Sequence, residues 1–267
     1  MIRFLRRFDP HSIRLLVFDL DGTLIDSRLD LIHSVNATLR HFGRPELAGD
    51  IIASYVGDGA PVLVRRALAG QAGNGVDEAM FREALEYFLG YYRLHKLDHT
   101  TVYDGIPETL AALAGDPCGA AAPAGRQSDA LFGSPSPGSG SLTSNGRVDK
   151  SVRPMRLMAV LSNKPVRPSQ DIVKALGLGD YFVRVYGGNS FPTKKPDPLG
   201  VRTLLEETGV AAEEALIIGD SSIDVLTGRN AGLWACGVTY GFAPHTLEEV
   251  MPDVVLDRPR ELRELLI

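Results

Sequence analysis

Residues 15–27 read LLVFDLDGTLIDS, an apolar run that ends abruptly in two carboxylates. The run predicts a buried strand, and Asp19 and Asp21 follow it at its carboxyl end, where open α/β sheets bind their ligands. Because residues two apart point the same way in an extended chain, both carboxylates can reach one site. Adjacent carboxylates repel each other unless a cation lies between them. We expect Mg²⁺, which prefers oxygen ligands and phosphate-bearing substrates. The alternative for this stretch alone is a strand followed by an ordinary Asp-Gly turn.

A second apolar run, residues 157–161, also ends in small polar residues. Ser162 carries a hydroxyl and Asn163 an amide, and both groups can hold a phosphate oxygen. Ser162 could instead cap the next helix. However, Pro165 and Pro168 delay that helix, which we expect to begin at about Pro168. The sequence therefore predicts a second strand whose end carries anion-binding groups.

Two further segments supply a lysine and a second pair of carboxylates. Residues 193–198, TKKPDP, place a lysine beside a proline. Such a lysine is a point charge for phosphate or carboxylate, although a lone Lys-Pro pair is usually a solvated turn. Residues 215–219 predict a third strand, and a helix is expected to open just after Asp220. Asp220 and Asp224 can then share one face of the first turn, where carboxylates are also favoured for purely structural reasons.

In this order, the four elements resemble the motifs of the haloacid dehalogenase superfamily, and the first resembles the Asp-x-Asp-Gly-Thr signature of its phosphatases. The resemblance implies that Asp19 is the nucleophile, which forms an aspartyl-phosphate, and that Asp21 is the general acid/base. A carboxylate nucleophile splits one hard displacement into two easier ones. The family's motif lysine directly precedes the first proline, which implies Lys195 and not Lys194.

The resemblance also implies the phosphate-binding and metal-binding groups. Ser162 is expected to bind the transferring phosphoryl group, with the backbone N–H of Asn163 beside it. The implied cofactor is Mg²⁺, and its ligands are Asp19, Asp21 (through the backbone carbonyl) and Asp220. Asp224 is expected to orient Lys195 or a metal-bound water rather than to bind the metal directly.

Residues 28–100 predict a helical segment directly after the first motif, with amphipathic runs over 29–39, 62–68 and 77–94. Its aromatic residues are expected to pack between helices. Such an insert resembles the small cap domain of the superfamily. Within it, residues 56–68, VGDGAPVLVRRAL, resemble the cap of bacterial phosphoglycolate phosphatases. Gly57, Gly59 and Arg65 are therefore expected to bind a small carboxylate at a helix N-terminus. A plain turn between helices is the alternative.

The expected architecture is α/β: a doubly wound, parallel-sheet (Rossmann-like) core with a small α-helical cap domain. The core comprises residues 1–27 and 101–267, and the cap comprises residues 28–100. Residues 115–154 are rich in Gly, Ala, Ser and Pro and predict a disordered surface insertion.

The resemblance implies Mg²⁺-dependent hydrolysis of a small phosphomonoester, with 2-phosphoglycolate as the first candidate. A sugar phosphate, a nucleotide or pyrophosphate remains open as substrate. A β-phosphoglucomutase-like phosphomutase is disfavoured, because Leu31 stands where such mutases carry a cap histidine and His33 lies two residues further on.

Composition agrees with this assignment. The chain has 267 residues and a net charge of -5, which gives no reason to expect a nucleic-acid partner. No apolar run reaches transmembrane length, and the two cysteines, Cys118 and Cys236, indicate no disulfide framework. Residues 1–14 form a basic arm without the features of a secretory signal. We therefore expect a cytoplasmic monomer or homodimer that acts on a small phosphorylated metabolite away from membranes.

Overall fold

The computed structural model describes residues 1–70, 75–115 and 156–267. From residue 116 onward, the expected insertion at 115–154 lies outside the described residues, and so does Cys118.

Three buried parallel strands form the centre of the main sheet, and each ends at one of the sequence motifs. β2 (Leu15–Phe18) lies between β5 (Leu157–Leu161) and β7 (Ala215–Gly219). Leu15 pairs in register with Leu157 on one side and with Ala215 on the other. The carboxyl ends of the three strands therefore meet at the same edge of the sheet, as the sequence predicts.

The whole sheet, within the described residues, has the strand order β1-β9-β8-β7-β2-β5-β6. The outer strands are β6 (Arg184–Tyr186), β8 (Trp234–Val238), β9 (Val254–Leu256) and β1 (Arg3–Phe4). All neighbouring pairs are parallel except β1 with β9, which is antiparallel. The sequence predicts only a basic arm before the first central strand, whereas Arg3 and Phe4 add an edge strand there. Two residues are too short a segment to show strand periodicity.

Helices cover both faces of this sheet, and alternate residues of β2 face opposite layers. Leu16 and Phe18 pack into a cluster with α5 (Ile106–Leu113), α6 (Val166–Ala175) and α9 (Arg260–Leu266). Leu15 and Val17 pack into a second cluster with α7 (Leu199–Thr208) and α8 (Ser222–Ala231). The predicted doubly wound α/β class is thus confirmed, because a central strand buried on both faces is its signature.

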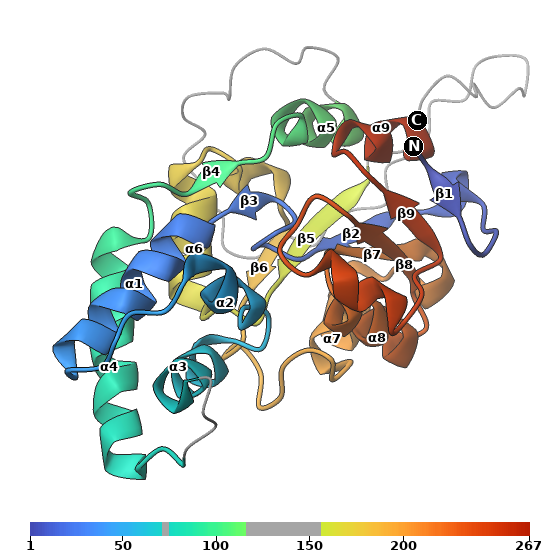
Figure 1. The fold of residues 1–267 in the computed structure, drawn as a ribbon. Helices are drawn as coiled ribbons and strands as arrows, with labels where there is room; N and C mark the ends of the chain where they lie inside the picture. The colour runs from blue at the N-terminus through green and yellow to red at the C-terminus, as the bar shows by residue number, and fades with distance from the viewer. Residues whose placement is uncertain (71–74, 116–155) are drawn as a thin grey trace, which may run out of the picture.

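The chain leaves the sheet at β3 (Ile25–Asp26) and returns at β4 (Thr101–Val102), and these two strands form a separate antiparallel pair. Between them lie α1 (Arg28–His41), α2 (Gly49–Ser54), α3 (Ala60–Ala69) and α4 (Glu78–His95). We call α1–α4 the helical unit. It stands to one side of the sheet in Figure 1, and it has its own apolar cluster, which includes Phe81, Phe88 and Tyr92.

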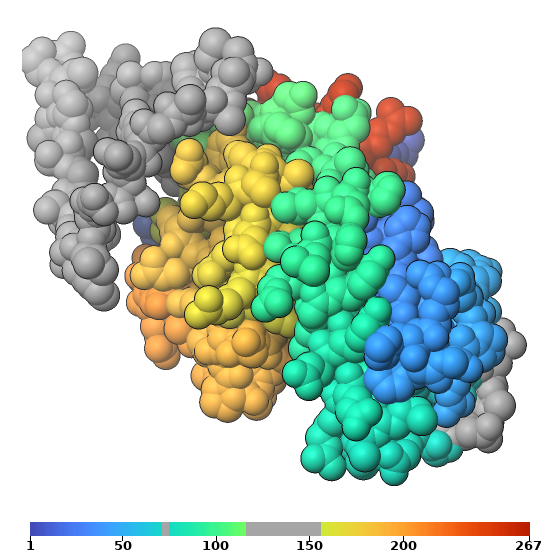
Figure 2. All heavy atoms as spheres, turned by 90° about the vertical axis from the view of Figure 1, so that its left-hand side faces the viewer, coloured from blue at the N-terminus to red at the C-terminus, as the bar shows by residue number. Residues whose placement is uncertain are grey.

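The three predicted amphipathic runs are confirmed as α1, α3 and α4, whereas α2 has only one buried residue and is too short for a clear helical period. In Figure 2, α4 (teal) lies directly beside α6 (yellow). Lys96, just after α4, makes an ion pair of 3.3 Å with Asp171 of α6. The helical unit therefore lies against α6, one of the helices that cover the sheet.

The helix after β5 begins earlier than predicted, at Val166. Pro168 lies within its first turn, where the backbone N–H groups have no partner inside the helix, so a proline is tolerated there. Short 3₁₀ turns complete the structure at Pro10–Ser12, Gly179–Tyr181, Ala212–Glu214 and Pro244–Glu248. None of the helices in the described ranges combines the length and the apolar character that a membrane span requires.

Candidate active site

A cavity of about 70 Å³ lies where the ends of β2, β5 and β7 face the helical unit. Its charged lining comprises five residues expected from the sequence, Asp19, Asp21, Lys195, Asp220 and Asp224, together with Lys164. Its apolar lining comes largely from the helical unit and includes Leu31, Leu63, Phe88, Leu89 and Tyr92. A small, charged base under an apolar roof suits a small ionic ligand.

Lys195 lies between two carboxylates at the base of the cavity. Its Nζ is 2.8 Å from Oδ1 of Asp19 and 2.6 Å from Oδ1 of Asp224, and its side chain is 3% exposed. Burial raises the pKa of Asp19 to about 6, against the attraction of Lys195. Burial alone would lower the pKa of Lys195, but the two carboxylates raise it, so that its ammonium stays charged. Lys194 instead lies outside this group, and its Nζ donates to the carbonyl of Asp58.

Asp21 is held by two donors that the sequence reading did not single out. Ser27 Oγ donates to its Oδ1 over 2.5 Å. Lys164 Nζ lies 2.8 Å from Oδ1 and 2.9 Å from Oδ2. The same ammonium lies 4.8 Å from the ring centroid of Tyr92 on α4. A charged residue in the polar loop after β5, two positions beyond Ser162, is the sequence signal that could have identified Lys164.

Asp220 completes a group of three carboxylates. Asp19, Asp220 and Asp224 each offer an oxygen, and these oxygens lie within 4.8 Å of one another. Burial, reinforced by the charges of Asp224 and Asp19, raises the pKa of Asp220 to about 7. Its Oδ2 accepts the backbone N–H groups of Phe242 and Ala243. Burial and neighbouring carboxylates thus both favour the neutral form of Asp220 in the absence of a cation.

Asp224 has less freedom to bind a metal than Asp19 or Asp220. Its Oδ1 is paired with Lys195. Its Oδ2 accepts both the backbone N–H and the hydroxyl of Ser221, the residue that precedes α8. With both oxygens engaged, Asp224 holds the ammonium of Lys195, and its role beside the metal stays a prediction.

Ser162 and Asn163 both line the cavity, but they differ in what their side chains can do. The Asn163 Nδ2 donates to the carbonyls of Gly57 and Lys195, over 3.0 Å and 3.1 Å. An amide has two N–H hydrogens, so both are used to join the helical unit to the lysine loop. The Asn163 amide is therefore not available to a phosphate, and the phosphate contact expected for the Asn163 backbone N–H stays a prediction. Ser162 Oγ accepts the backbone N–H of Lys164 over 3.3 Å.

Of the three residues predicted within the helical unit, two line the cavity. Gly57 and Gly59 have φ values of +128° and +88°, and a Cβ on Gly59 would lie 3.0 Å from the Asn163 carbonyl oxygen. Arg65 is the correction: it does not line the cavity. Its Nη1 is 2.7 Å from Glu78, and its guanidinium lies 3.8 Å from the centroid of the Phe81 ring. Because α3 begins at Ala60, Arg65 lies more than one turn from the N-terminus of that helix.

The sequence is similar to a known family of hydrolases and to named phosphatases. The haloacid dehalogenase-like hydrolase family matches residues 16–119 and 155–238. The phosphoglycolate phosphatase of Pseudomonas fluorescens is 34% identical over 265 residues, which cover 98% of this chain and 83% of that protein. The phosphoglycolate phosphatase of Pseudomonas syringae pv. tomato is 33% identical over 252 residues, which cover 93% and 78%.

Solved structures agree. The crystal structure of a predicted phosphoglycolate phosphatase from Haemophilus somnus gives a TM-score of 0.77 at 26% identity and covers 96% of this chain and 99% of that chain. A haloacid dehalogenase-like family protein from Streptococcus pneumoniae has the same fold, with a TM-score of 0.72 at 21% identity over 96% and 99% of the two chains.

Proposed function

The chain belongs to the haloacid dehalogenase-like hydrolase family and is a phosphatase, and we propose that it is a Mg²⁺-dependent enzyme that hydrolyses 2-phosphoglycolate to glycolate and phosphate. Asp19 and Lys195 support hydrolysis of a phosphate ester. Lys164, which contacts Asp21 and so would face the leaving group, supports 2-phosphoglycolate as the substrate.

The residues at the base of the cavity fit Mg²⁺. Four carboxylates and two lysines line the cavity, so its acidic groups outnumber its basic ones and a divalent cation would offset the excess. Asp19, Asp220 and the backbone carbonyl of Asp21 would hold the ion, since Mg²⁺ prefers oxygen ligands and retains several waters. When bound, it offsets the charge of the phosphoryl oxygens and of Asp19.

Asp19 is proposed as the nucleophile. Its carboxylate oxygen forms a bond to phosphorus as the bond from phosphorus to the alkoxide oxygen breaks, which gives an aspartyl-phosphate and the alcohol. Lys195, 2.8 Å from Oδ1, fixes the carboxylate and interacts with the phosphoryl charge. The Ser162 hydroxyl and the Asn163 N–H bind phosphoryl oxygens that Lys195 does not reach.

Asp21 is proposed as the general acid/base. It donates its proton to the departing alkoxide and then takes a proton from the water that attacks the aspartyl-phosphate, which releases phosphate and restores Asp19. Its neighbours hold it in place through both steps, because Ser27 and Lys164 bind its carboxylate. The ammonium of Lys164 also offsets the negative charge that Asp21 carries once the proton has left.

The observation that carries the substrate proposal is the position of Lys164. If Asp21 protonates the leaving group, the alkyl part of that group would lie near the ammonium of Lys164. In glycolate this part ends in a carboxylate, which an ammonium binds well. The cavity of about 70 Å³ also favours a short substrate over a nucleotide. The curated relatives named as phosphoglycolate phosphatases give independent support.

The helical unit is proposed to act as a cap, with residues 28–100 as its extent and residues 1–27 and 101–267 as the catalytic core. Its apolar side chains form much of the cavity roof, which excludes water and limits substrate size. A phosphomutase remains disfavoured, since Leu31 occupies the roof where a mutase places a histidine. His33 lies exposed near His99 instead.

A substrate panel tests the proposal. kcat/KM would be measured for 2-phosphoglycolate, ethyl phosphate, a sugar phosphate, a nucleoside monophosphate and pyrophosphate at one Mg²⁺ concentration. Ethyl phosphate is the matched control, because it has the same carbon skeleton without the carboxylate. We expect phosphoglycolate to exceed it by about 10-fold or more, as a charge-assisted contact implies. A clear preference for another compound would replace phosphoglycolate, while hydrolysis of none would contradict the phosphatase proposal itself.

A further inference from the structure

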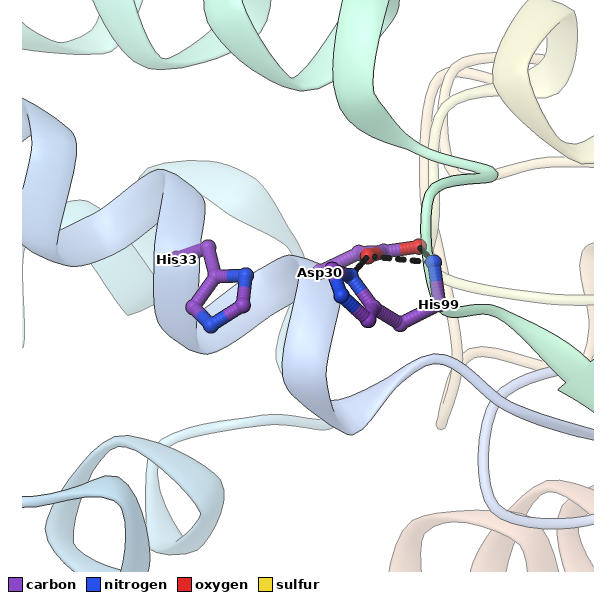
Figure 3. Close-up of side chains that lie close together, drawn as sticks. All are labelled: Asp30, His33 and His99. Atoms are coloured by element: carbon purple, nitrogen blue, oxygen red, sulfur yellow. Dashed lines mark hydrogen bonds and ion pairs between the residues drawn. The ribbon is translucent and has the colours of Figure 1, made fainter.

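Three residues next to the β3–β4 pair form a cluster that the proposed reaction does not use. Asp30 lies in the first turn of α1, His33 lies one turn later, and His99 lies in the segment that connects α4 to β4. One ligand atom from each lies within 4.8 Å of the others. Figure 3 shows His33 and Asp30 on the same helix, with the His99 ring between them. The cluster thus joins the two chain segments that link the helical unit to the sheet.

Asp30 is occupied by backbone and hydroxyl donors, so it is not the main ligand of this cluster. It is 1% exposed. Its oxygens accept the N–H of His99, the N–H of Thr100 and the hydroxyl of Thr100, over distances of 2.7–3.2 Å. These bonds use most of the acceptor positions of a carboxylate. Asp30 therefore anchors the returning segment to the start of α1.

The remaining contact of Asp30 determines how His99 is presented. His99 Nδ1 lies 3.0 Å from Asp30 Oδ1. Because a carboxylate only accepts, this contact favours the neutral tautomer of His99 that carries its hydrogen on Nδ1, and in that tautomer the lone pair of Nε2 is free. Carboxylates orient metal-binding histidines in this way in many metal sites. His33 supplies a second imidazole beside His99. Its ring lies edge-on to that of His99, with centroids 5.0 Å apart.

Both imidazoles are open to solvent, so an ion in solution can reach them. His33 is exposed and the His99 side chain is 47% exposed. An ion bound by one nitrogen of each ring needs contacts of about 2.0–2.1 Å, which a rotation of the exposed His33 side chain can provide. Water would complete the coordination.

We propose that His33 and His99, oriented by Asp30, form a second metal site that binds a divalent transition-metal ion such as Zn²⁺. Imidazole nitrogen suits Zn²⁺, Ni²⁺ and Cu²⁺, whereas Mg²⁺ prefers oxygen. The site is thus chemically distinct from the carboxylate group at Asp19 and Asp220. A bound ion would link α1 to the segment that returns to the sheet, and so would fasten the base of the helical unit.

The test is Zn²⁺ binding to the purified, untagged full chain in saturating Mg²⁺, measured by isothermal titration calorimetry. His33→Ala and His99→Ala should each weaken this binding about 10-fold or more, as the loss of one of two protein ligands implies. His95→Ala is the matched control. His95 also has a carboxylate partner, Asp98 at 2.7 Å, but it does not belong to the cluster, so its loss should leave the affinity unchanged.

Two further measurements separate this site from the active site. Binding of Co²⁺ to imidazole nitrogen changes its visible spectrum relative to Co²⁺ in water, and that change should be lost in the His33→Ala/His99→Ala double variant. Asp30→Asn should keep the site but weaken it about 10-fold, as the loss of an orienting partner does. If the double variant binds Zn²⁺ as tightly as the wild type, or if the wild type binds none below millimolar concentration, the proposed site does not exist.

Discussion

The ammonium of Lys164 lies 2.8 Å and 2.9 Å from the two carboxylate oxygens of Asp21, and 4.8 Å from the centre of the Tyr92 ring. One side chain from the loop after β5 thus contacts both the proposed general acid and the helical unit. The side chain of Lys164 is only 5% exposed, so this contact is made away from bulk water, where charge interactions are strong. The position of α4 and the environment of Asp21 are therefore linked through a single residue.

Replacement of Lys164 tests its proposed contact with the substrate carboxylate. Lys164→Met keeps the apolar stem and removes the charge. We expect the KM for phosphoglycolate to rise about 10- to 100-fold, from the loss of one charge-assisted contact. The KM for ethyl phosphate should change much less, because that compound has no carboxylate.

Lys194→Met is the control for the Lys164 experiment. Lys194 is also near the site, but its Nζ donates to the carbonyl of Asp58 rather than to a catalytic carboxylate. Its loss should leave the ratio of the two KM values unaltered. An equal loss for both substrates in Lys164→Met would assign the lysine to Asp21 alone and would remove the argument for a carboxylate subsite.

Asp19→Asn tests the covalent step. The amide keeps the size of the side chain but cannot attack phosphorus, so we expect kcat to fall by about 10³-fold or more. The melting temperature should not fall sharply, because the substitution also removes a buried carboxylate with a raised pKa. Rapid-quench detection of an acid-stable phosphoprotein in the wild type, absent from the variant, would complete the test. Appreciable turnover by pure Asp19→Asn protein would contradict the mechanism.

Asp21→Asn tests proton transfer. Phosphoglycolate has a poor leaving group that needs a proton, whereas an aryl phosphate has a good one. Formation of the phosphoenzyme should therefore be slowed far more for phosphoglycolate than for the aryl phosphate, as measured in single-turnover experiments. If both substrates lose the same factor, Asp21 does not act as the acid in the first step.

The raised pKa of Asp220, about 7, predicts how stability depends on pH and on Mg²⁺. In the metal-free protein the folded state holds this proton more tightly than the unfolded state, so the carboxyl contributes stability below pH 4. That contribution is lost as the pH rises towards 7. Mg²⁺ binds the ionised form. The increase in melting temperature on adding Mg²⁺ should therefore be larger at pH 8 than at pH 5, as differential scanning calorimetry can show.

Asp220→Asn is the comparison for that measurement. The amide does not titrate, so most of the pH dependence of the Mg²⁺ effect should disappear and the Mg²⁺ concentration needed for activity should rise. Asp19 also has a raised pKa, about 6, and a residual pH dependence below pH 6 is expected from it. An unchanged Mg²⁺ response in Asp220→Asn would exclude Asp220 as a ligand.

Much of the fold and of the active-site base can be predicted from the sequence because the signals are local. Leu15 to Phe18 form an apolar run of strand length, and strand direction places Asp19 at the carboxyl edge. Two more such runs end in Ser162 and Asp220. The carboxyl ends of parallel strands lie at one edge of the sheet. The proximity of these residues can therefore be predicted even when the loop conformations are unknown. The choice of Lys195 over Lys194 came from the family motif, and the structure places Lys195 between Asp19 and Asp224.

The tertiary structure decided which long side chains reach which partners. Lys164 contacts Asp21 across 143 positions of the chain, and Arg65 turns to Glu78 rather than to the cavity. The two amide hydrogens of Asn163 are used by Gly57 and Lys195, although from the sequence alone that amide could also have held a phosphate oxygen. Strand periodicity fixes the direction of a Cβ atom, but a flexible lysine or arginine chooses its partner from whatever charge the packing of distant segments brings within reach. For the same reason, only the folded chain brings His99 beside Asp30 and His33, where the helical unit meets the sheet.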